Sequence, residues 1–343
     1  MSFFLVYNFH MKSIQISQPN HLSLIDVPMP QPGMDEVLIR VQASGICGTD
    51  IHIFHGEFLG GYPCVPGHEF SGVVEQVGAA VTRYHIGDRV AVEPNIACNN
   101  CVNCLNNRQN FCLNWTAVGV TRPGGMAQYV LAPENAVFSI GDLPFEQGAF
   151  VEPLSCVLHG SERARIRMGD RVALLGAGPI GLLLQQVARI QGAADITVVE
   201  RQLARAEAAA TFGADRVITD LADLETDAYD VVIDATGVIP LMSHTIDFAR
   251  PGGTVLLFGV PPSGKKIEFE AFQVFHKGLT ILSSFTSVRN SYQAVALLSS
   301  GQVNVADLIS HRLPLDQFQH GMELIEQGRE RVMKVMILPN GSN

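Results

Sequence analysis

Four cysteines lie within fifteen residues of one another, and no other stretch of this chain is as specific. They follow the spacing C-x2-C-x2-C-x7-C, at Cys98, Cys101, Cys104 and Cys112. Four thiols so close together are typical of a tetrahedral zinc site that takes all its ligands from the protein. Disulfides or unrelated buried thiols are the alternative, but unrelated cysteines do not cluster in this way, and a chain this large has little need of disulfides. The spacing predicts a structural zinc lobe at residues 95–115 and leaves open where any chemistry happens.

A second set of possible metal ligands lies in two segments that we expect to form turns between strands. The segment GICGTDIH contains Cys47, and the segment PGHE contains His68 and Glu69. Cysteine, histidine and carboxylate make a mixed zinc ligand set, and such a set with an open position is typical of catalytic zinc. Glu152, in the segment VEPLS, is a further carboxylate that could be reached across an interdomain cleft. Each residue is ordinary by itself, and only the combination predicts a reactive metal site.

A glycine-rich motif, GAGPIG, follows a predicted strand directly and opens a predicted helix. In that context its glycines allow a tight turn, close approach of the backbone to a pyrophosphate, and close packing of helix on strand. The acid that ends the next strand would accept hydrogen bonds from ribose hydroxyls, which favours NAD over NADP, whereas the arginine after it could reach a 2′-phosphate instead. The predicted cofactor contacts are Gly176, Gly178, Pro179, Ile180, Gly181, Glu200 and Arg201.

The elements that must position these residues change in character near residue 150. Up to that point, short alternating strands separated by proline and glycine predict a β-rich domain. Beyond it, apolar strands alternate with helices, which predicts a parallel, doubly wound α/β sheet of six strands. We expect these strands at residues 171–177, 195–200, 216–219, 231–236, 254–259 and 279–285. We expect helices at residues 179–191, 202–212 and 240–249, and another after Pro153.

The length of 343 residues favours two domains. After about residue 300, a helix near 315–328 and a last strand, KVMIL, form a short tail that we expect to return to the first domain. The chain is therefore expected to consist of a catalytic zinc-binding domain, at 11–155 and 300–343, and a dinucleotide-binding domain at 156–299.

Composition and charge exclude several classes of protein. A hydrophobic fraction of 47% with 16% charged residues excludes disordered and fibrous classes. The net charge of -10 argues against a nucleic-acid or membrane partner, and a zinc-knuckle nucleic-acid binder would need more than the one basic residue of the lobe, Arg108. Seven cysteines, mostly clustered, favour a reducing compartment and hence the cytoplasm.

The first ten residues do not resemble a secretory signal, and we expect either that Met11 is the natural start or that residues 1–10 are a loose extension.

Taken together, the motifs resemble the zinc-dependent medium-chain dehydrogenase/reductase family from residue 11 onward. GICGTDIH, PGHEFSGVV, the four-cysteine lobe, EPLSCVLHG and GAGPIG carry the resemblance. It implies a GroES-like catalytic domain joined to a Rossmann domain. The glutamate in VEPLS, where alcohol dehydrogenases of the family carry cysteine, is similar to the sorbitol/polyol dehydrogenase branch. Animal sorbitol dehydrogenases, however, lack the four-cysteine lobe and carry an Arg-Tyr pair where this chain has Thr286 and Ser287.

The resemblance also implies roles for single residues. Cys47, His68 and Glu69 would hold the catalytic zinc, with Glu152 as a direct or water-mediated fourth ligand. The Thr49 hydroxyl would contact the substrate oxygen, and His52 would end a proton relay. The Asp50 carboxylate would orient the histidine ligand. Candidate pocket residues are Ile53, Phe54, Phe58 and Trp115, although the favoured interpretation of each is a plain apolar wall or core residue and not a specificity determinant.

The function implied is oxidation of a secondary alcohol of a polyol, sugar alcohol or sugar acid to a ketone, with NAD or NADP as acceptor and two zinc ions per subunit. The alternatives are an L-threonine 3-dehydrogenase-like or general secondary alcohol dehydrogenase and, outside enzymes, an NAD sensor. A sensor would have no need of a proton relay. The strand at 279–285 is expected at a sheet edge, where relatives pair with a second subunit, so a homodimer or homotetramer is expected.

Overall fold

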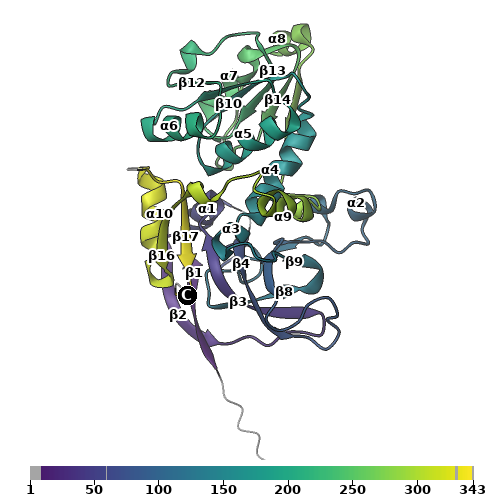
Figure 1. Ribbon diagram of the computed structural model, residues 1–343, viewed down its shortest axis with the longest axis vertical. Helices are drawn as coiled ribbons and strands as arrows, with labels where there is room; N and C mark the ends of the chain where they lie inside the picture. The colour runs from purple at the N-terminus through teal and green to yellow at the C-terminus, as the bar shows by residue number, and fades with distance from the viewer. Residues whose placement is uncertain (1–8, 59, 329–330, 342–343) are drawn as a thin grey trace, which may run out of the picture.

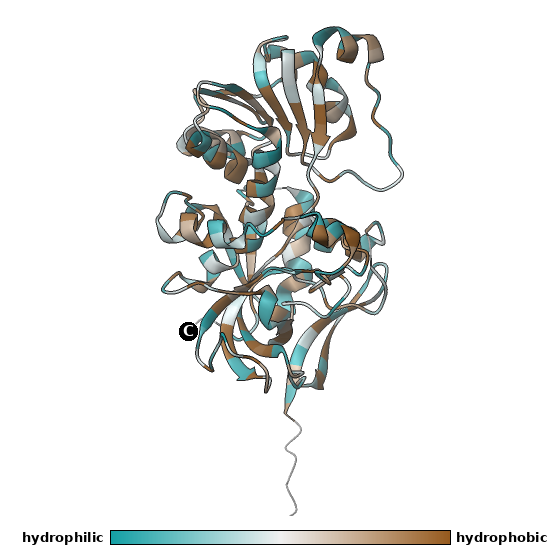
Figure 2. Ribbon diagram, turned by 90° about the vertical axis from the view of Figure 1, so that its right-hand side faces the viewer, coloured by the Kyte–Doolittle hydropathy of each residue, from teal (hydrophilic) through white to brown (hydrophobic). Residues whose placement is uncertain are grey.

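The computed structural model describes residues 9–58, 60–328 and 331–341. The expectation about the first ten residues therefore falls almost wholly outside the described part. Two large sheets form the centres of an upper and a lower body, and helix α4 lies between them (Figure 1). Hydrophobic residues follow the strands of both sheets (Figure 2). Among the described residues, no helix combines the length and the apolar character needed to cross a membrane.

The lower sheet has seven strands in the order β16-β17-β3-β4-β5-β9, with β8 also paired to β3. Its strands are β3 (Glu36–Gly45), β4 (Glu69–Val77), β5 (Arg89–Val92), β8 (Tyr129–Pro133), β9 (Val137–Ser139), β16 (Ile309–Pro314) and β17 (Lys334–Leu338). The last strand of the chain, β17, pairs antiparallel with the end of β3, where Met336 lies opposite Gly45. The C-terminal tail is thus built into the same sheet as the segment that carries Cys47.

The upper sheet has six parallel strands in the order β12-β11-β10-β13-β14-β15, as the sequence predicts. Its strands are β10 (Arg171–Leu175), β11 (Asp195–Val199), β12 (Arg216–Ile218), β13 (Tyr229–Asp234), β14 (Ala249–Leu257) and β15 (Thr280–Ser283). The helices that accompany them are α5 (Pro179–Gln191), α6 (Leu203–Thr211), α7 (Ile239–Phe248) and α8 (Ala271–Lys277). Strands β10 and β13 are buried along almost their whole length, which explains the apolar runs at their centres. Strand β15 lies at the predicted edge.

Helix α5 shows why the glycine-rich segment folds as it does. Pro179 occupies its first turn, where no amide donor is required, and Gly192 ends it in the left-handed conformation. The bounds of α5 coincide with the sequence expectation. Helix α8 and helix α9 (Ser291–Ser299) had not been predicted.

Helix α4 (Val151–Ala164) links the two sheets. It packs against β4 and β5 below, against β14 and β15 above, and along α9. The sequence placed this helix after Pro153, but it starts two residues earlier because a proline is tolerated in a first turn. Glu152 therefore lies in the first turn of a helix and not in a preceding loop.

The remaining elements are short. They are strands β1 (His10–Gln18), β2 (His21–Pro28), β6 (Asn95–Ile96) and β7 (Thr116–Ala117), and helices α1 (Gly48–His55), α2 (Val102–Leu105), α3 (Phe145–Gly148) and α10 (Phe318–Gln327). Five 3-10 turns complete the described chain, at Gln109–Phe111, Glu134–Ala136, Leu221–Asp223, Ala306–Leu308 and Leu315–Gln317.

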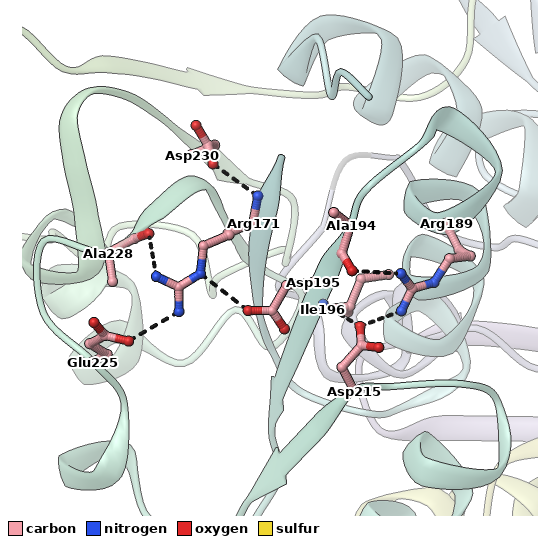
Figure 3. A network of polar contacts seen from close by, with 9 residues as sticks. All are labelled: Arg171, Arg189, Ala194, Asp195, Ile196, Asp215, Glu225, Ala228 and Asp230. Carbon is pink, nitrogen blue, oxygen red and sulfur yellow. Dashed lines mark hydrogen bonds and ion pairs between the residues drawn. The ribbon is translucent and has the colours of Figure 1, made fainter. Parts of the chain in front are cut away.

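A polar network ties together the ends of the upper strands where the chain enters the sheet (Figure 3). Arg171, at the start of β10, donates hydrogen bonds to oxygens of its neighbours Asp195, Glu225 and Ala228. Arg189 forms a similar pair with Asp215, which also accepts a hydrogen bond from the Ile196 amide, at 2.8 Å. These ion pairs are largely exposed, so each stabilises the sheet only weakly.

Candidate metal centres and dinucleotide site

Cys47, His68 and Glu69 meet at one end of the lower sheet. Their ligand atoms all lie within 4.8 Å of one another. Cys47 is the N-cap of α1, immediately after β3, and His68 and Glu69 lie at the start of the neighbouring strand β4. The sequence predicted turns for both segments. Cys47 and His68 do lie just outside regular elements, with α1 starting after Cys47 and β4 starting at Glu69.

Asp50 joins the two segments that carry these ligands. One of its oxygens, Oδ2, accepts a hydrogen bond from the Cys47 amide at 2.9 Å, and Oδ1 accepts one from the Gly67 amide at 3.1 Å. Gly67 has a φ of 94°, which disfavours any residue with a side chain. The Asp50 carboxylate is fully buried, and its Oδ1 lies 3.6 Å from Nδ1 of His68. This arrangement matches the orienting role expected for Asp50 and extends it to the backbone of both segments.

The imidazole of His68 is buried between two acidic groups. Burial lowers the pKa of His68, but Cys47 and Asp50 together raise it by more than burial lowers it. The net pKa of the imidazole is therefore well above the ordinary value. Its Nδ1 has no hydrogen-bond partner within the described part of the chain. Because Nδ1 faces the Asp50 carboxylate, the other ring nitrogen is available to a divalent cation beside the thiol and the Glu69 carboxylate.

Lys334 is a partner of Glu69 that no sequence motif indicates. Its ammonium group pairs with Oε2 of Glu69 and donates a hydrogen bond to the Ile46 carbonyl at 3.2 Å. Both side chains are almost fully buried, and a Cβ atom at Gly45 would lie only 2.5 Å from the same carboxylate oxygen. One oxygen of Glu69 is thus paired with a buried lysine.

A cavity of about 300 Å³ opens beside this group. It is lined by Cys47, His68 and Glu69, and also by Thr49 and Glu152. Glu152 is outside the compact three-ligand group, although it shares the cavity. Burial raises the pKa of Glu152 to about 7. Its Oε1 also accepts a hydrogen bond from the Cys156 thiol, at 3.3 Å, a contact that no sequence motif indicated.

The other pocket candidates divide between the cavity and the core. Phe58 and Trp115 line the cavity. Ile53 and Phe54 pack in the hydrophobic core beneath it, so the core alternative holds for those two. His52 does not line the cavity but lies three residues after Thr49 on α1, on the same helix face, and its Nδ1 is 3.0 Å from Oε2 of Glu57.

The four cysteines of the lobe converge as their spacing predicts. Their sulfur atoms lie within 4.8 Å of one another, and none of the seven cysteines forms a disulfide. A backbone amide at Asn100 lowers the pKa of the Cys98 thiol to about 6, whereas burial raises that of Cys104 to about 12. Four convergent sulfurs with no disulfide fit a tetrahedral zinc ion.

Among the glycines of the glycine-rich loop, Gly178 is the one with open space where a side chain would be. Gly178 is the N-cap of α5, and a Cβ atom there would meet no heavy atom within 4 Å. A Cβ atom at Gly181 would lie 2.1 Å from the Gly176 carbonyl oxygen, so this glycine permits close packing of helix on strand. Ile180, in the first turn of α5, lines the same cavity as the Cys47 group. The loop therefore offers free amide donors at a helix N-terminus.

Glu200 lies at the end of β11 and is buried. Its carboxylate accepts hydrogen bonds from the Ala177 amide at 3.0 Å and the Gln202 amide at 2.8 Å. It thereby ties the glycine-rich loop to the next strand, and each oxygen keeps a lone pair for another donor. The side chain of Arg201 is exposed beside it.

Comparison with known proteins identifies both halves of the chain. The Alcohol dehydrogenase GroES-like domain family matches residues 33–142, and the Zinc-binding dehydrogenase family matches residues 179–300. D-arabinitol dehydrogenase 1 of Uromyces fabae is 32% identical over 342 residues, which cover 96% of this chain and 97% of the relative. The chain belongs to the zinc-binding dehydrogenase family. It is an enzyme of the zinc-containing, nicotinamide-dependent medium-chain class, with the GroES-like and Rossmann-type architecture predicted from the sequence.

Further relatives of this dehydrogenase include enzymes of two substrate types. D-altritol 5-dehydrogenase of Agrobacterium fabrum is 34% identical, covering 90% of this chain and 94% of the relative. L-threonine 3-dehydrogenase of Rhizobium johnstonii is also 34% identical, covering 93% and 96%. Among solved structures, a putative zinc-binding dehydrogenase from Sinorhizobium meliloti, bound to NADP, has a TM-score of 0.92, 36% identity and coverage of 96% of this chain and all of that one.

The loop geometry of the dehydrogenase predicts different outcomes for two alanine substitutions. Gly181→Ala should lower the free energy of unfolding by about 3 kcal/mol, because the new methyl group collides with backbone. Gly178→Ala should leave thermal unfolding unchanged but weaken NADH and NADPH binding by about tenfold or more, since its methyl group occupies the space for a pyrophosphate. Calorimetry and fluorescence titration measure the two effects. Equal behaviour of the two variants would contradict the assignment.

Proposed function

We propose that this dehydrogenase oxidises a secondary alcohol of a polyol, sugar alcohol or sugar acid to the ketone. The observation that carries the proposal is the Cys47, His68 and Glu69 group, placed beside a cavity that Glu152 and the first turn of the dinucleotide helix also line. The polyol relatives from Uromyces and Agrobacterium support the substrate class.

Zinc bound at this group would supply a Lewis acid that lowers the pKa of the substrate hydroxyl, and the nicotinamide ring would accept the hydride. We infer that Cys47, His68 and Glu69 hold that zinc, and that Glu152 completes the set directly or through water. Asp50 orients the His68 ring through its contact with Nδ1. The Cys98, Cys101, Cys104 and Cys112 group would hold a second, structural zinc ion.

In this proposal Thr49 accepts the proton of the substrate hydroxyl and passes its own proton on toward His52, one turn along α1. Glu57 holds the His52 ring through its Nδ1. The substrate would lose one proton by this route, and its hydride would go to a bound nicotinamide, so the products would be a ketone and the reduced cofactor. The aromatic walls Phe58 and Trp115 exclude bulk water from the site.

We infer a preference for NAD from Glu200. Its carboxylate lies where a ribose hydroxyl could donate to it and where a 2′-phosphate would be repelled. Arg201 beside it and the NADP bound to the Sinorhizobium relative favour the other cofactor. The contacts proposed for either cofactor are Gly176, Gly178, Pro179, Ile180, Gly181, Glu200 and Arg201.

The domain limits and the surroundings of the enzyme also remain proposals. We propose a catalytic domain at 11–155 and 300–343 and a dinucleotide-binding domain at 156–299, consistent with the two sheets. The edge position of β15 supports a homodimer or homotetramer formed through that strand, which sedimentation would test. The free thiols favour a cytoplasmic location, which fractionation of cells would test.

A substrate panel tests the proposed function. Wild-type enzyme loaded with zinc should reduce NAD with D-arabinitol or D-altritol, read as nicotinamide absorbance, with a lower rate for NADP. L-threonine is the matched alternative, because a threonine dehydrogenase shares the same metal and nucleotide motifs. Turnover of L-threonine but of no polyol would favour that second function. Inactivity on every alcohol tested would contradict the enzymatic proposal as a whole.

A further inference from the structure

Two hydroxyl groups in the candidate active-site cavity have no partner. Ser284 and Thr286 lie on either side of Phe285, directly after β15, and all three residues line the cavity that holds Cys47. The Oγ atom of Ser284 and the Oγ1 atom of Thr286 are both buried, and neither has a hydrogen-bond partner within the described residues. Buried polar atoms are nearly always hydrogen-bonded, so two orphans in one cavity point to a missing ligand.

The rest of the cavity cannot provide partners for these hydroxyls. Its lining is mostly apolar and includes Phe58, Trp115, Phe258 and Val260. The polar lining residues include the proposed zinc ligands and Thr49, which already have a role in the reaction. Asn95 also lines the cavity, but its side-chain amide bonds to Glu93 and accepts a hydrogen bond from Trp115. The two orphan hydroxyls are therefore available for a part of the substrate other than the reacting carbon.

The backbone at Thr286 is strained in a way that fits a functional position. Its φ of 52° lies in the left-handed region, which is a rare conformation for a β-branched residue. Such strain persists only where neighbouring contacts enforce it, and it is concentrated at active sites and ligand clamps. A glycine would adopt this conformation without strain. The presence of a threonine here therefore indicates that its side chain has a role of its own.

Contacts from the lower body hold Thr286 in place on both sides. On one side, Asn110 of the four-cysteine lobe donates a hydrogen bond from Nδ2 to the Phe285 carbonyl at 2.9 Å, and the Phe111 ring stacks on the Phe285 ring with centroids 5.9 Å apart. On the other side, the Ser287 hydroxyl donates to the buried carboxylate of Glu93 at 2.6 Å. The loop that carries Thr286 is thus clamped by the lobe and by Glu93.

We propose that the hydroxyls of Thr286 and Ser284 bind substrate hydroxyl groups beyond the reacting carbon, and that the four-cysteine lobe positions Thr286 through Asn110. This inference rests on the proposed polyol oxidation and names the residues that select for it. It gives the lobe a part in substrate selection as well as in stability. Thr286 and Ser284 are specificity residues, whereas Asn110 acts only through the loop and is a positioning residue.

The test compares a polyol with a secondary alcohol that has no other hydroxyl. Thr286→Val keeps the β-branched shape and removes the hydroxyl, and Ser284→Ala does the same for its neighbour. Each should lower kcat/KM for D-arabinitol and D-altritol by about 10- to 100-fold, mainly through KM, and change that for butan-2-ol by less than about twofold. The matched control is Ser283→Ala, because Ser283 is exposed and does not line the cavity.

Three outcomes would overturn the assignment of the two hydroxyls. Equal losses on the polyols and on butan-2-ol would indicate a general structural role. A loss of NADH affinity, measured by fluorescence titration, would mean that the hydroxyls bind the cofactor. Unchanged kinetics in both variants would mean that the hydroxyls contact nothing. Failure of the proposed function is distinguishable, because wild-type enzyme itself would then oxidise neither polyol, and the inference would fall with it.

The positioning role of the lobe has its own comparison. Asn110→Ala should lower kcat/KM for the polyols about fivefold or more and leave butan-2-ol and the zinc content unchanged. Asn106→Ala is the control, because Asn106 is an exposed lobe residue whose side chain bonds only to the Val102 carbonyl in the described contacts. Equal effects of the two substitutions, or loss of zinc in Asn110→Ala, would contradict a specific role for Asn110.

Discussion

Replacement of Cys47 by serine is expected to lower turnover of the alcohol by about a thousandfold or more, because it removes the thiolate of the proposed catalytic zinc site. A serine hydroxyl stays protonated at neutral pH and is a poor zinc ligand. NADH binding should be largely intact, because the glycine-rich loop belongs to the other sheet. Steady-state kinetics and a fluorescence titration with NADH measure the two properties on the same preparation.

The matched control is the same substitution at Cys64. This thiol lies outside both groups of possible metal ligands, and burial raises its pKa to about 11, so it is a structural thiol and not a reactive one. Cys64→Ser should keep most of the activity. If Cys47→Ser were as active as wild-type enzyme, the reaction would not take place at this group.

The second large effect is expected in the four-cysteine lobe. Cys104→Ser should reduce the zinc content by one ion per subunit and lower the thermal unfolding midpoint by about 10 °C. Cys104 is buried, and its sulfur lies 3.5 Å from that of Cys101, so a serine there breaks a closed ligand set. Elemental analysis and calorimetry give the two values. The lobe should also become sensitive to proteolysis between residues 95 and 115.

Cys64→Ser serves again as the control for this prediction, since it removes a thiol without touching either group. Retention of both zinc ions and of the wild-type midpoint in Cys104→Ser would contradict a structural zinc at this place. Cys47→Ser and Cys104→Ser should also differ in stability measured without NADH, because only Cys104→Ser removes a ligand of the proposed structural zinc.

The upper sheet could be predicted well because its signals are local. The central strand β10 is an apolar run after its first residue, and α5 begins with Pro179 and is capped by Gly192. Helix α8 was missed because it is short and carries the exposed aromatic residues Phe272 and Phe275, which do not form an apolar face against the sheet. Local propensity cannot recognise such an element.

The metal ligands could be predicted from their types, but their supporting contacts could not. Lys334 pairs with Glu69 across 265 positions of the sequence, because β17 returns beside β3. The core position of Ile53 and Phe54, which the sequence left open, has a similar origin. Both lie on α1 close to Thr49 in sequence, but the helix directs them into the core and presents Thr49 to the cavity. Burial and pairing of this kind depend on the tertiary fold.

The zinc content of the wild-type enzyme tests the central claim most directly, because the account needs one metal at Cys47, His68 and Glu69 and another in the lobe. Elemental analysis of protein purified without chelators should give two zinc ions per subunit. A value of one would mean that the lobe or the proposed catalytic group does not hold zinc, and a value of zero would contradict both sites.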